Sequence, residues 1–331
     1  MSLQLFAVAG IGEVGAGDDI AQIIVDSVDA PLHDGDVVVV TSKIVSKAAG
    51  LATTVDRDVV MAEETDRIVA TRGQMRIVRT RHGLTLAAAG IDASNIALGQ
   101  IIPLPRDSDL AARELRSRLI ALTGAEVAVI VTDTAGRAWR VGQTDIAIGA
   151  AGIKPHLDFT GVEDAYGNVL AVTAPAIADE IAGATDLVAE KLGGNPVVIA
   201  RGIPHDWLLA DDQTGAATLI RDENGDLFGL GSRDAVFAAC NQGMDLRGFP
   251  ADEDNTIDEL IRRAQQGMAP TEAQVRSTDG SKLQVFPTAA VPGPVEWIAV
   301  GAVAEQLRVL ARAMRLDVAI EVEVEVEVDE S

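Results

Sequence analysis

The chain has 331 residues, of which 48% are hydrophobic and 23% are charged, so it can bury enough apolar surface to fold into one or two domains. Aromatic residues make up only 3%, so the core must be built mainly from Ala, Val, Ile and Leu. The 27 basic and 50 acidic residues give a formal net charge of −23. This charge argues against a nucleic acid or an anionic membrane as partner, because both attract a broad basic surface.

Cysteine content and the N-terminus indicate the compartment. Cys240 is the only cysteine, which excludes an internal disulfide and a zinc site built from cysteines. The N-terminus lacks the pattern of a signal peptide, and no apolar run approaches the roughly 20 residues of a membrane helix. We therefore expect a cytoplasmic protein.

The first predicted elements are a strand, a glycine loop and a helix. Residues 3–8 form an apolar run typical of a strand, and Asp18 is a suitable N-cap for a helix over 18–28. The apolar run 36–41 predicts a strand buried on both faces, followed by a polar loop at 42–47. Ligands often bind at loops that follow such strands.

The middle of the chain alternates apolar runs with amphipathic segments, which predicts a mixed α/β fold. One apolar strand ends at residue 132 and leads into a second polar loop, residues 132–137. The predicted helices cover 60–70, 104–123 and 177–192, and the predicted strands cover 126–132, 145–151, 169–173 and 196–200.

Beyond about residue 203 the pattern is looser. A helix is predicted over 298–314. Residues 320–328 alternate strictly between apolar and acidic side chains, so this segment can form a strand with one apolar and one acidic face. A solvated tail is the alternative, because like charges at every second residue repel one another.

The glycine loop is the first candidate for ligand binding. Residues 10–15 match G-x-G-x-x-G directly after a predicted strand, which favours a dinucleotide site and a nicotinamide-dependent oxidoreductase. However, Glu13, Asp18 and Asp19 would place negative charge where that motif binds a pyrophosphate. A structural loop that needs the backbone freedom of glycine is an equally good interpretation.

A second candidate follows the buried strand at 36–41. No P-loop motif is present in the chain, but Thr41, Ser42, Lys43 and Lys47 offer hydroxyl and ammonium groups at the end of this strand. Such groups could bind phosphates. The alternative is that both lysines are solvated surface side chains, as most lysines are.

The richest segment runs from Thr132 to Asp145. Asp133 follows a buried strand, where its carboxylate could bind a hard cation with oxygen ligands. Arg137 and Arg140 could pair with phosphate or carboxylate groups. The alternative is a turn in which Asp133 accepts hydrogen bonds from its own loop and pairs with Arg137.

A second acidic loop lies at 161–168. Its Asp164 could supply the other carboxylate of a metal site. Taken alone, the loop would be the turn of a hairpin.

Several segments in order resemble one family, the coenzyme F420:L-glutamate ligases, also called F420-0:γ-glutamyl ligases. The resemblance spans about residues 1–235, which would form the ligase domain. Residues 236–331 would be an extension of unknown role or a degenerate remnant of a nitroreductase-like domain, for which no flavin is expected. The matching segments are 10–14, 17–19, 36–47, 85–95, 131–143, 161–168, 178–182 and 196–202.

The resemblance implies a family-specific mixed α/β fold, neither a P-loop nor a Rossmann fold, in a homodimer that uses GTP. It also implies Mg²⁺ or Mn²⁺, two ions per site, with K⁺ as a further ion. The implied metal ligands are Asp133, Asp164 and Ala165, and the implied catalytic residues are Asp133, Arg137 and Arg140. The implied nucleotide contacts are Ile11, Gly12, Glu13, Val14, Ser42, Lys43, Lys47, Gly136, Thr214 and Gly215.

The expected reaction is GTP-dependent addition of L-glutamate to the precursor F420-0 through an acyl phosphate, with release of GDP and phosphate. Further γ-linked glutamates could be added by the same chemistry. Two alternatives belong to other classes: the oxidoreductase that uses the loop at residues 10–15, and a non-catalytic protein that binds a deazaflavin precursor.

Overall fold

The computed structural model describes residues 2–190, 193–210, 213–222, 225–241, 243–244, 246, 248–249, 255–267, 273–278 and 281–323. The chain divides between Arg221 and Asp222 into two compact units, which we call the N-terminal unit and the C-terminal unit. Residue 235, the expected domain boundary, lies within helix α6 (Gly231–Cys240) of the C-terminal unit.

A mixed five-stranded sheet forms the centre of the N-terminal unit, in the order β1-β8-β2-β6-β7. Strands β2 and β6 are parallel, and the other neighbouring pairs are antiparallel. The mixed α/β fold predicted from the sequence is therefore confirmed. The strands are β1 (Gln4–Ala7), β2 (Val37–Thr41), β6 (Ala128–Gly136), β7 (Gln143–Ala151) and β8 (Val197–Arg201).

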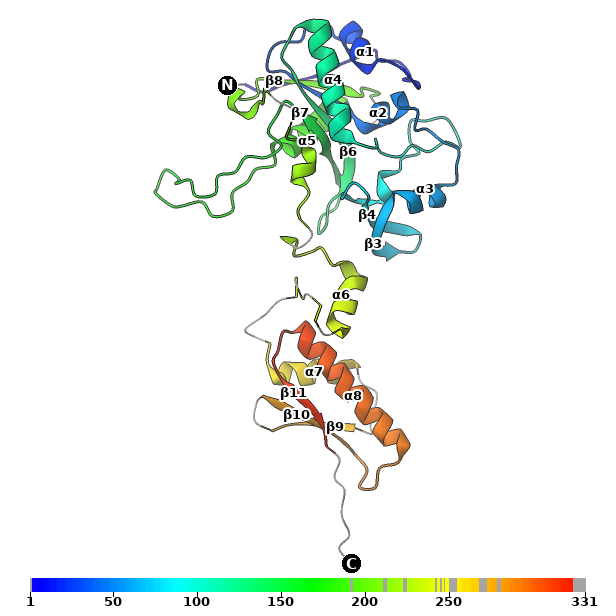
Figure 1. Cartoon of the computed structure of the whole chain (residues 1–331), viewed down its shortest axis with the longest axis vertical. Coiled ribbons are helices and arrows are strands. Elements are labelled where there is room, and N and C mark those ends of the chain that lie inside the picture. The colour runs from blue at the N-terminus through cyan, green and yellow to red at the C-terminus, as the bar shows by residue number, and fades with distance from the viewer. Residues whose placement is uncertain are drawn as a thin grey trace, which may run out of the picture. The chain divides into compact units, whose positions relative to one another are not determined.

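Helices cover both faces of this sheet. Helices α1 (Ile20–Ser27) and α4 (Ser108–Thr123) pack on one face, where Val38 and Val40 of β2 join their core. Helix α5 (Ile177–Ala189) packs on the other face, against Val37 and Val39. Successive side chains of a strand point to opposite faces, so a strand covered on both sides must be apolar throughout, as β2 is. Figure 1 shows the helices around the sheet.

The predicted polar loop at 42–47 is wrong, because helix α2 (Ser42–Ala48) begins directly after β2. Its side chains Ile44 and Val45 are buried in the core beneath α1 and α4, and this burial stabilises the helix. The second predicted loop is also wrong at its start, since β6 continues to Gly136 and pairs with β7.

A small second sheet, β3-β4-β5, lies in the same unit. The predicted helix at 60–70 is correct only in its first part, because the chain changes from helix to strand at Thr65. Ile68 pairs with Val78 on the neighbouring strand, and β-branched residues favour such pairing. The elements are α3 (Arg57–Glu64), β3 (Thr65–Arg72), β4 (Met75–Thr80), β5 (Thr85–Ala87) and the short 3₁₀ helix η1 (Ala88–Gly90).

Between β7 and α5 the chain leaves the sheet and forms a projecting loop, residues 156–174, which we call the arm (Figure 1). The predicted strand at 169–173 is wrong, since the described backbone of the arm forms an isolated bridge between Glu163 and Val169 but no strand. Val172 is 90% exposed. The segment has the composition of a strand and makes a few backbone hydrogen bonds to residues 159–162, but these do not form a regular ladder.

Two 3₁₀ helices, η2 (His205–Trp207) and η3 (Ala216–Leu219), follow β8. The remaining predicted elements of this unit are confirmed, with ends that differ by a few residues. They are the strands at 3–8, 36–41, 145–151 and 196–200 and the helices at 18–28, 104–123 and 177–192, of which residues 191–192 lie outside the described part of the chain.

The C-terminal unit has a three-stranded sheet in the order β11-β10-β9, with its core between the sheet and helices α7 and α8. The helix predicted at 298–314 is confirmed. The predicted strand at 320–328 is confirmed in its first residues, and its part beyond Glu323 lies outside the described residues. The elements are α7 (Ile257–Gly267), β9 (Ala273–Ser277), β10 (Lys282–Pro287), α8 (Pro294–Ala313) and β11 (Ala319–Val322). None of the helices in the described part of the chain is long and apolar enough to span a membrane.

Candidate functional site

A cavity of about 450 Å³ opens in the N-terminal unit where β2 and β6 end. Because these two strands are parallel, their carboxyl ends meet at one edge of the sheet, a common place for ligand sites in α/β proteins. The lining comes from the glycine loop (11–14), the start of α2 (43, 44 and 47), residues 132, 134 and 145 of β6 and β7, the end of α5 (185, 186, 189 and 190), and residues 194–196.

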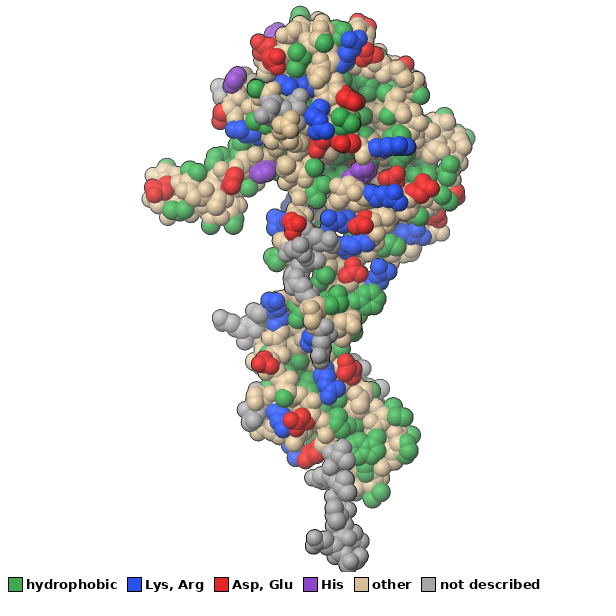
Figure 2. Space-filling model, viewed as in Figure 1, with side chains coloured by type: hydrophobic (Ala, Val, Ile, Leu, Met, Phe, Trp, Pro, Cys, Tyr) green, Lys and Arg blue, Asp and Glu red, His purple; other side chains and the backbone are tan. Residues whose placement is uncertain are grey.

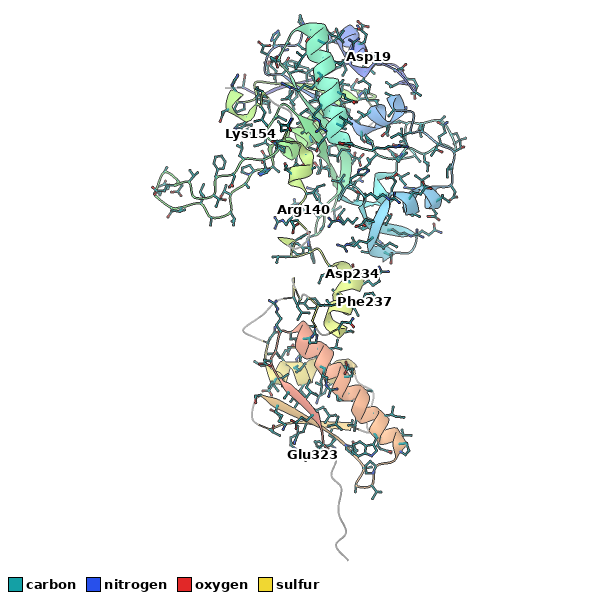
Figure 3. The ribbon with its side chains drawn as sticks, viewed as in Figure 1. Asp19, Arg140, Lys154, Asp234, Phe237 and Glu323 are labelled. Carbon is teal, nitrogen blue, oxygen red and sulfur yellow. The ribbon has the colours of Figure 1, made fainter. Side chains whose placement is uncertain are left out.

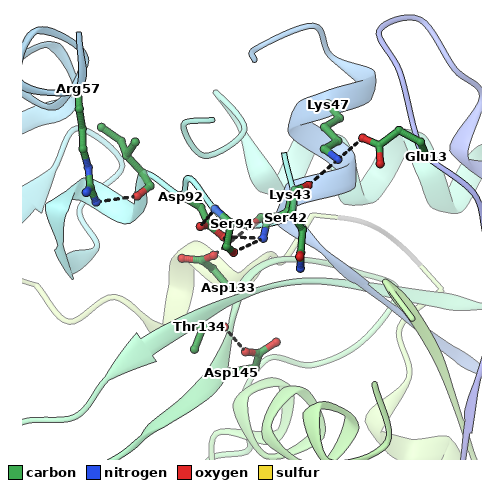
Figure 4. Close-up of polar contacts among 12 residues, drawn as sticks. Glu13, Ser42, Lys43, Lys47, Arg57, Asp92, Ser94, Asp133, Thr134 and Asp145 are labelled. Carbon is green, nitrogen blue, oxygen red and sulfur yellow. Dashed lines mark hydrogen bonds and ion pairs between the residues drawn. The ribbon is translucent and has the colours of Figure 1, made fainter. Parts of the chain in front are cut away.

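Lys47 is nearly buried, with 9% of its side chain exposed. Its Nζ donates to Glu13 Oε1 at 2.5 Å and to the Asn95 carbonyl oxygen at 2.9 Å (Figure 4). The glycine loop, α2 and the segment after η1 therefore converge on one ammonium group. Glu13 does not place an uncompensated negative charge at the cavity, because Lys47 pairs with it.

Lys43 is 16% exposed and pairs with Asp92, with 2.6 Å between Nζ and Oδ2. Its Nζ also donates to Ser94 Oγ at 2.9 Å. Both lysines line the cavity. The alternative, that these lysines are solvated surface side chains, is therefore wrong.

Asp133 lies beside the start of α2 and accepts a hydrogen bond from Ser42 Oγ at 3.1 Å (Figure 4). Burial raises the pKa of its carboxyl to about 7, and the nearby carboxylate of Asp145 adds to this effect. Positive charge placed beside Asp133 would favour the ionised form. Its carboxylate and the Ser42 hydroxyl are ligand types that Mg²⁺ and Mn²⁺ accept.

Asp145 is held by two threonines of the neighbouring strand. Thr132 Oγ1 donates to Asp145 Oδ2 at 2.9 Å, and Thr134 Oγ1 donates to Asp145 Oδ1 at 2.8 Å. All three residues line the cavity. Sequence analysis assigned no role to Asp145, because its contact with the threonines depends on the register in which β6 pairs with β7.

Arg137, Arg140 and Gly136 lie at the β6–β7 hairpin and do not line the cavity. Arg137 Nη2 donates to the Val141 carbonyl oxygen at 3.0 Å and so crosses the turn. Arg140 is exposed, and Figure 3 shows its side chain near the end of this hairpin. The turn in which Asp133 pairs with Arg137 is not formed, because Asp133 faces Ser42.

Asp164 lies in a turn of the arm, apart from Asp133. Its Oδ1 accepts the backbone N–H groups of Tyr166 at 2.8 Å and Asn168 at 2.9 Å. Hydrogen bonds from Asn168 and Tyr166 hold the pKa of the Asp164 carboxyl below its ordinary value. Neither Asp164 nor Ala165 lines the cavity. Within the described residues, no group of three His, Cys, Asp or Glu side chains is arranged to bind a metal ion.

Thr214 and Gly215 lie against α4 rather than in the cavity. Asp109 of α4 accepts the backbone N–H groups of Ala216 at 2.7 Å and Ala217 at 3.1 Å. A side chain at residue 215 would clash, because a Cβ there would lie 2.2 Å from Asp109 Cγ. Asp109 therefore positions this loop, a contact that sequence analysis missed because the two segments are far apart in the chain.

The glycine loop differs from a dinucleotide-binding turn at the helix that follows. Asp19, and not Asp18, caps α1, and its carboxylate accepts the backbone N–H of Gln22 at 3.1 Å (Figure 3). Asp18 Oδ2 accepts the backbone N–H of Gly15 at 2.7 Å. The carboxylates of Asp18 and Asp19 therefore already accept hydrogen bonds from backbone N–H groups at the start of α1. In a dinucleotide-binding turn, such N–H groups would bind the pyrophosphate.

Residues 10–58 and 56–202 match the model of the family described as F420-0:Gamma-glutamyl ligase. The chain is 38% identical over 252 residues to the coenzyme F420:L-glutamate ligase of Methanothermobacter thermautotrophicus, an alignment covering 69% of this chain and 99% of that protein. The ligase of Methanopyrus kandleri is 37% identical over 65% of this chain and 93% of its own length. That of Methanosarcina mazei is 35% identical over 70% of this chain and 98% of its own length. The matched family segments lie in the N-terminal unit.

Proposed function

The chain belongs to the F420-0:Gamma-glutamyl ligase family, and from this premise we propose that it joins L-glutamate to F420-0 with GTP as the energy source. The observation that carries the proposal is the cavity at the ends of β2 and β6. Lys43 and Lys47 line it, and the half-buried Asp133 with its partner Ser42 lies at the start of α2, outside the lining. The names of the relatives support F420-0 and L-glutamate as substrates. The two lysines of the cavity support a co-substrate that carries phosphate groups.

The proposed chemistry has two steps. A carboxylate oxygen is a poor leaving group, so the F420-0 carboxylate first attacks the γ-phosphorus of GTP, which forms an acyl phosphate and releases GDP. The amine of L-glutamate then attacks the acyl carbon, the bond to the phosphate oxygen breaks, and the amine gives up a proton as the amide forms. Both steps depend mainly on positioning and on neutralisation of phosphate charge.

The charges around Lys43 and Lys47 support the proposal that a divalent cation takes part. The two lysines contribute two positive charges, and their partners Asp92 and Glu13 contribute two negative charges, so this part of the site is close to neutral. A triphosphate therefore requires further positive charge. Asp133 and Ser42 would hold Mg²⁺ or Mn²⁺, which neutralises phosphate oxygens during transfer.

We further propose that the active form is a homodimer in which the arm of one copy reaches the cavity of the other. Within one chain, Asp164 and Ala165 lie away from Asp133, so they can ligate the same metal ions only from a second copy. The arm has the composition of a contact surface, since it exposes large apolar side chains (Figure 2). These are Phe159, Val162, Tyr166, Val169 and Val172.

Arg137 and Arg140 are proposed to bind a carboxylate of the substrate. Both are exposed cations on the hairpin that follows Asp133, and a guanidinium can pair with a carboxylate through two hydrogen bonds. Two ions per site and a role for K⁺ remain part of the proposal, as does the addition of further glutamates.

The test is to incubate the purified protein with F420-0, GTP, Mn²⁺ and L-glutamate and to analyse the products by mass spectrometry. We expect one or more glutamyl additions with an equal amount of GDP. Product without GTP, or none with all four components, would contradict the proposal. Thermal stabilisation by NAD alone would favour the oxidoreductase, and stabilisation by F420-0 without turnover would favour the binding protein.

A further inference from the structure

Lys43 and Lys47 lie about one turn apart on α2, and one short segment, residues 92–95, contacts both ammonium groups. We call this segment the lysine-holding loop. Its Asn95 carbonyl oxygen accepts a hydrogen bond from Lys47 Nζ at 2.9 Å, and its other contacts are with Lys43. Between 48 and 51 residues of chain separate the paired groups, so sequence analysis assigned no role to this loop.

Asp92 and Ser94 form a closed set of contacts with Lys43 (Figure 4). Asp92 Oδ2 lies 2.6 Å from Lys43 Nζ. Ser94 Oγ accepts a hydrogen bond from Lys43 Nζ at 2.9 Å and donates one to Asp92 Oδ2 at 2.9 Å. The backbone N–H of Ser94 donates to Asp92 Oδ1 at 2.6 Å. Both carboxylate oxygens of Asp92 are therefore held, and they fix the position of the ammonium group.

The backbone of Asp92 is anchored to the core. Asp92 and Ile102 form an antiparallel bridge in which each N–H donates to the other's carbonyl oxygen, at 3.0 and 2.9 Å. Ile102 is buried, and so is Ile91, whose carbonyl oxygen accepts a hydrogen bond from Arg57 at 3.2 Å. A side chain on such a fixed backbone can hold its partner at a defined position.

These contacts leave donor capacity on both lysines. An ammonium group has three N–H donors. Lys43 uses two of them on the lysine-holding loop, and Lys47 uses one on this loop and one on Glu13. In the described part of the chain, no third acceptor contacts either group. Because both lysines line the cavity, each has one N–H left for a ligand while the other two hold it in place.

We propose that Asp92 is a positioning residue that acts through Lys43, by holding its ammonium group where it contacts the phosphate that is transferred. This inference rests on the proposed function and adds to it the residue that positions Lys43. Phosphoryl transfer depends mainly on positioning and on stabilisation of charge. The Asp92 carboxylate also cancels positive charge that would attract a nucleotide, so its loss should slow the transfer and not weaken nucleotide binding.

An effect of Asp92 on Asp133 is the alternative. Burial raises the pKa of Asp133, and the charge of Asp92 adds to this effect, so the two carboxylates are close enough to interact. A double-mutant cycle separates the two explanations. If Asp92 acts through Lys43, its substitution has no further effect once the Lys43 ammonium group is absent. An effect through Asp133 persists without it.

The first test compares ligation and GTP binding by the full chain with Mn²⁺ present. We expect Asp92→Asn to lower kcat by about tenfold, with a GTP dissociation constant no weaker than that of the unmodified protein and the same binding stoichiometry by calorimetry. Asp58→Asn is the matched control, because Asp58 pairs with Arg76 at 3.7 Å and does not line the cavity.

An unchanged kcat in Asp92→Asn would overturn the inference. A binding stoichiometry that falls in proportion to kcat would also overturn it, because that result shows a merely structural role. No ligation by the unmodified protein would instead overturn the proposed function.

The second test measures kcat for Lys43→Ala alone and together with Asp92→Asn. We expect the single and double variants to agree within about twofold, whereas a further tenfold loss in the double variant would overturn the inference. If a variant does not fold or has no measurable turnover, Ser94→Ala decides. It removes one acceptor of Lys43 and should lower kcat by about threefold at unchanged GTP affinity, and an unchanged kcat would overturn the inference.

Discussion

At the scale of single residues, burial determines what Asp133 can do. Its carboxyl has a pKa of about 7 because it is removed from water and lies near another carboxylate. Without a cation, much of it is protonated at neutral pH. A bound metal ion would favour the ionised form and displace that proton, so metal affinity should increase with pH.

We predict that Asp133→Asn abolishes ligation and stabilises the metal-free protein at pH 8. The folded-state pKa lies above the ordinary value of 3.8, so wild-type stability falls as the pH rises from about 4 to about 7. Asn does not ionise, so the variant should gain about 4 kcal/mol over wild type at pH 8 and almost nothing at pH 4. Denaturant unfolding in chelator measures the difference. Near-normal ligation by the variant would exclude Asp133 as the metal ligand.

Lys47→Ala should raise the KM for GTP by about tenfold and change the KM for glutamate much less. The ammonium group of Lys47 lines the cavity and pairs with the glycine loop, so its loss leaves Glu13 unpaired beside the phosphates. Lys282→Ala is the matched control, because Lys282 pairs with Glu321 in the C-terminal unit. If only the glutamate KM moved, the phosphates would have to bind elsewhere.

At the scale of elements, the arm is the segment that projects from the core of the N-terminal unit. Its backbone pairs with itself, for example from Gly161 N–H to the Leu170 carbonyl oxygen and from Leu170 N–H to the Val162 carbonyl oxygen. Its apolar side chains nevertheless remain exposed. Such a surface is unfavourable in water unless another surface covers it.

We predict that Asp133→Asn and Asp164→Asn chains complement each other. Each variant alone should be inactive. If one site takes Asp133 from one copy and Asp164 from the other, half of the dimers in an equal, refolded mixture are mixed, and each has one intact site. Activity should then return to roughly a quarter of wild type. No recovery, with mixed dimers demonstrated by mass, would show that the arm does not serve a partner's site.

The acidic C-terminal segment, residues 319–331, which we call the tail, begins with β11 and can be removed to test its role. Truncation after Val318 should leave ligation within roughly twofold, but it removes β11, whose Ile320 packs against the core of the C-terminal unit. We therefore expect faster hydrogen exchange in α8 and β10. Truncation after Glu323 keeps β11 and is the control. A tenfold loss of activity in a folded, dimeric truncated protein would place the tail in the active site or the subunit contact.

At the scale of the whole molecule, the two units differ in their relation to the family. An alignment covering 69% of this chain accounts for 99% of one relative, and the matched family segments end at residue 202. The C-terminal unit has its own core, built around Leu283, Val303 and Leu307. The cavity is lined by the N-terminal unit alone.

We predict that a chain ending at Arg221 retains ligase activity within about twofold of the full chain. It keeps the cavity, the arm and the loop held by Asp109, so every residue assigned to the reaction is present. Ligation kinetics and the mass of the assembly are the measurements. A folded, dimeric N-terminal unit with a tenfold lower rate would show that residues 222–331 contribute to catalysis.

The sequence alone determined the features that depend on neighbouring residues in the chain. The all-apolar runs of β2 and β6 predicted buried strands, because a strand covered on both faces admits no polar alternation. The ends of these strands also pointed to Lys43 and Lys47, which line the cavity, and to Asp133, which bonds to Ser42 outside its lining. The family resemblance rested on short segments in order, which need no tertiary information.

Only the tertiary structure decided which side chains meet. The register of β6 and β7 brings Asp145 to two threonines, and the packing of α2 turns an apparent polar loop into a helix. The projection of the arm separates Asp164 from Asp133. Pairing and burial of this kind join residues far apart in the chain, and local propensity is too weak to predict them because tertiary contacts override it.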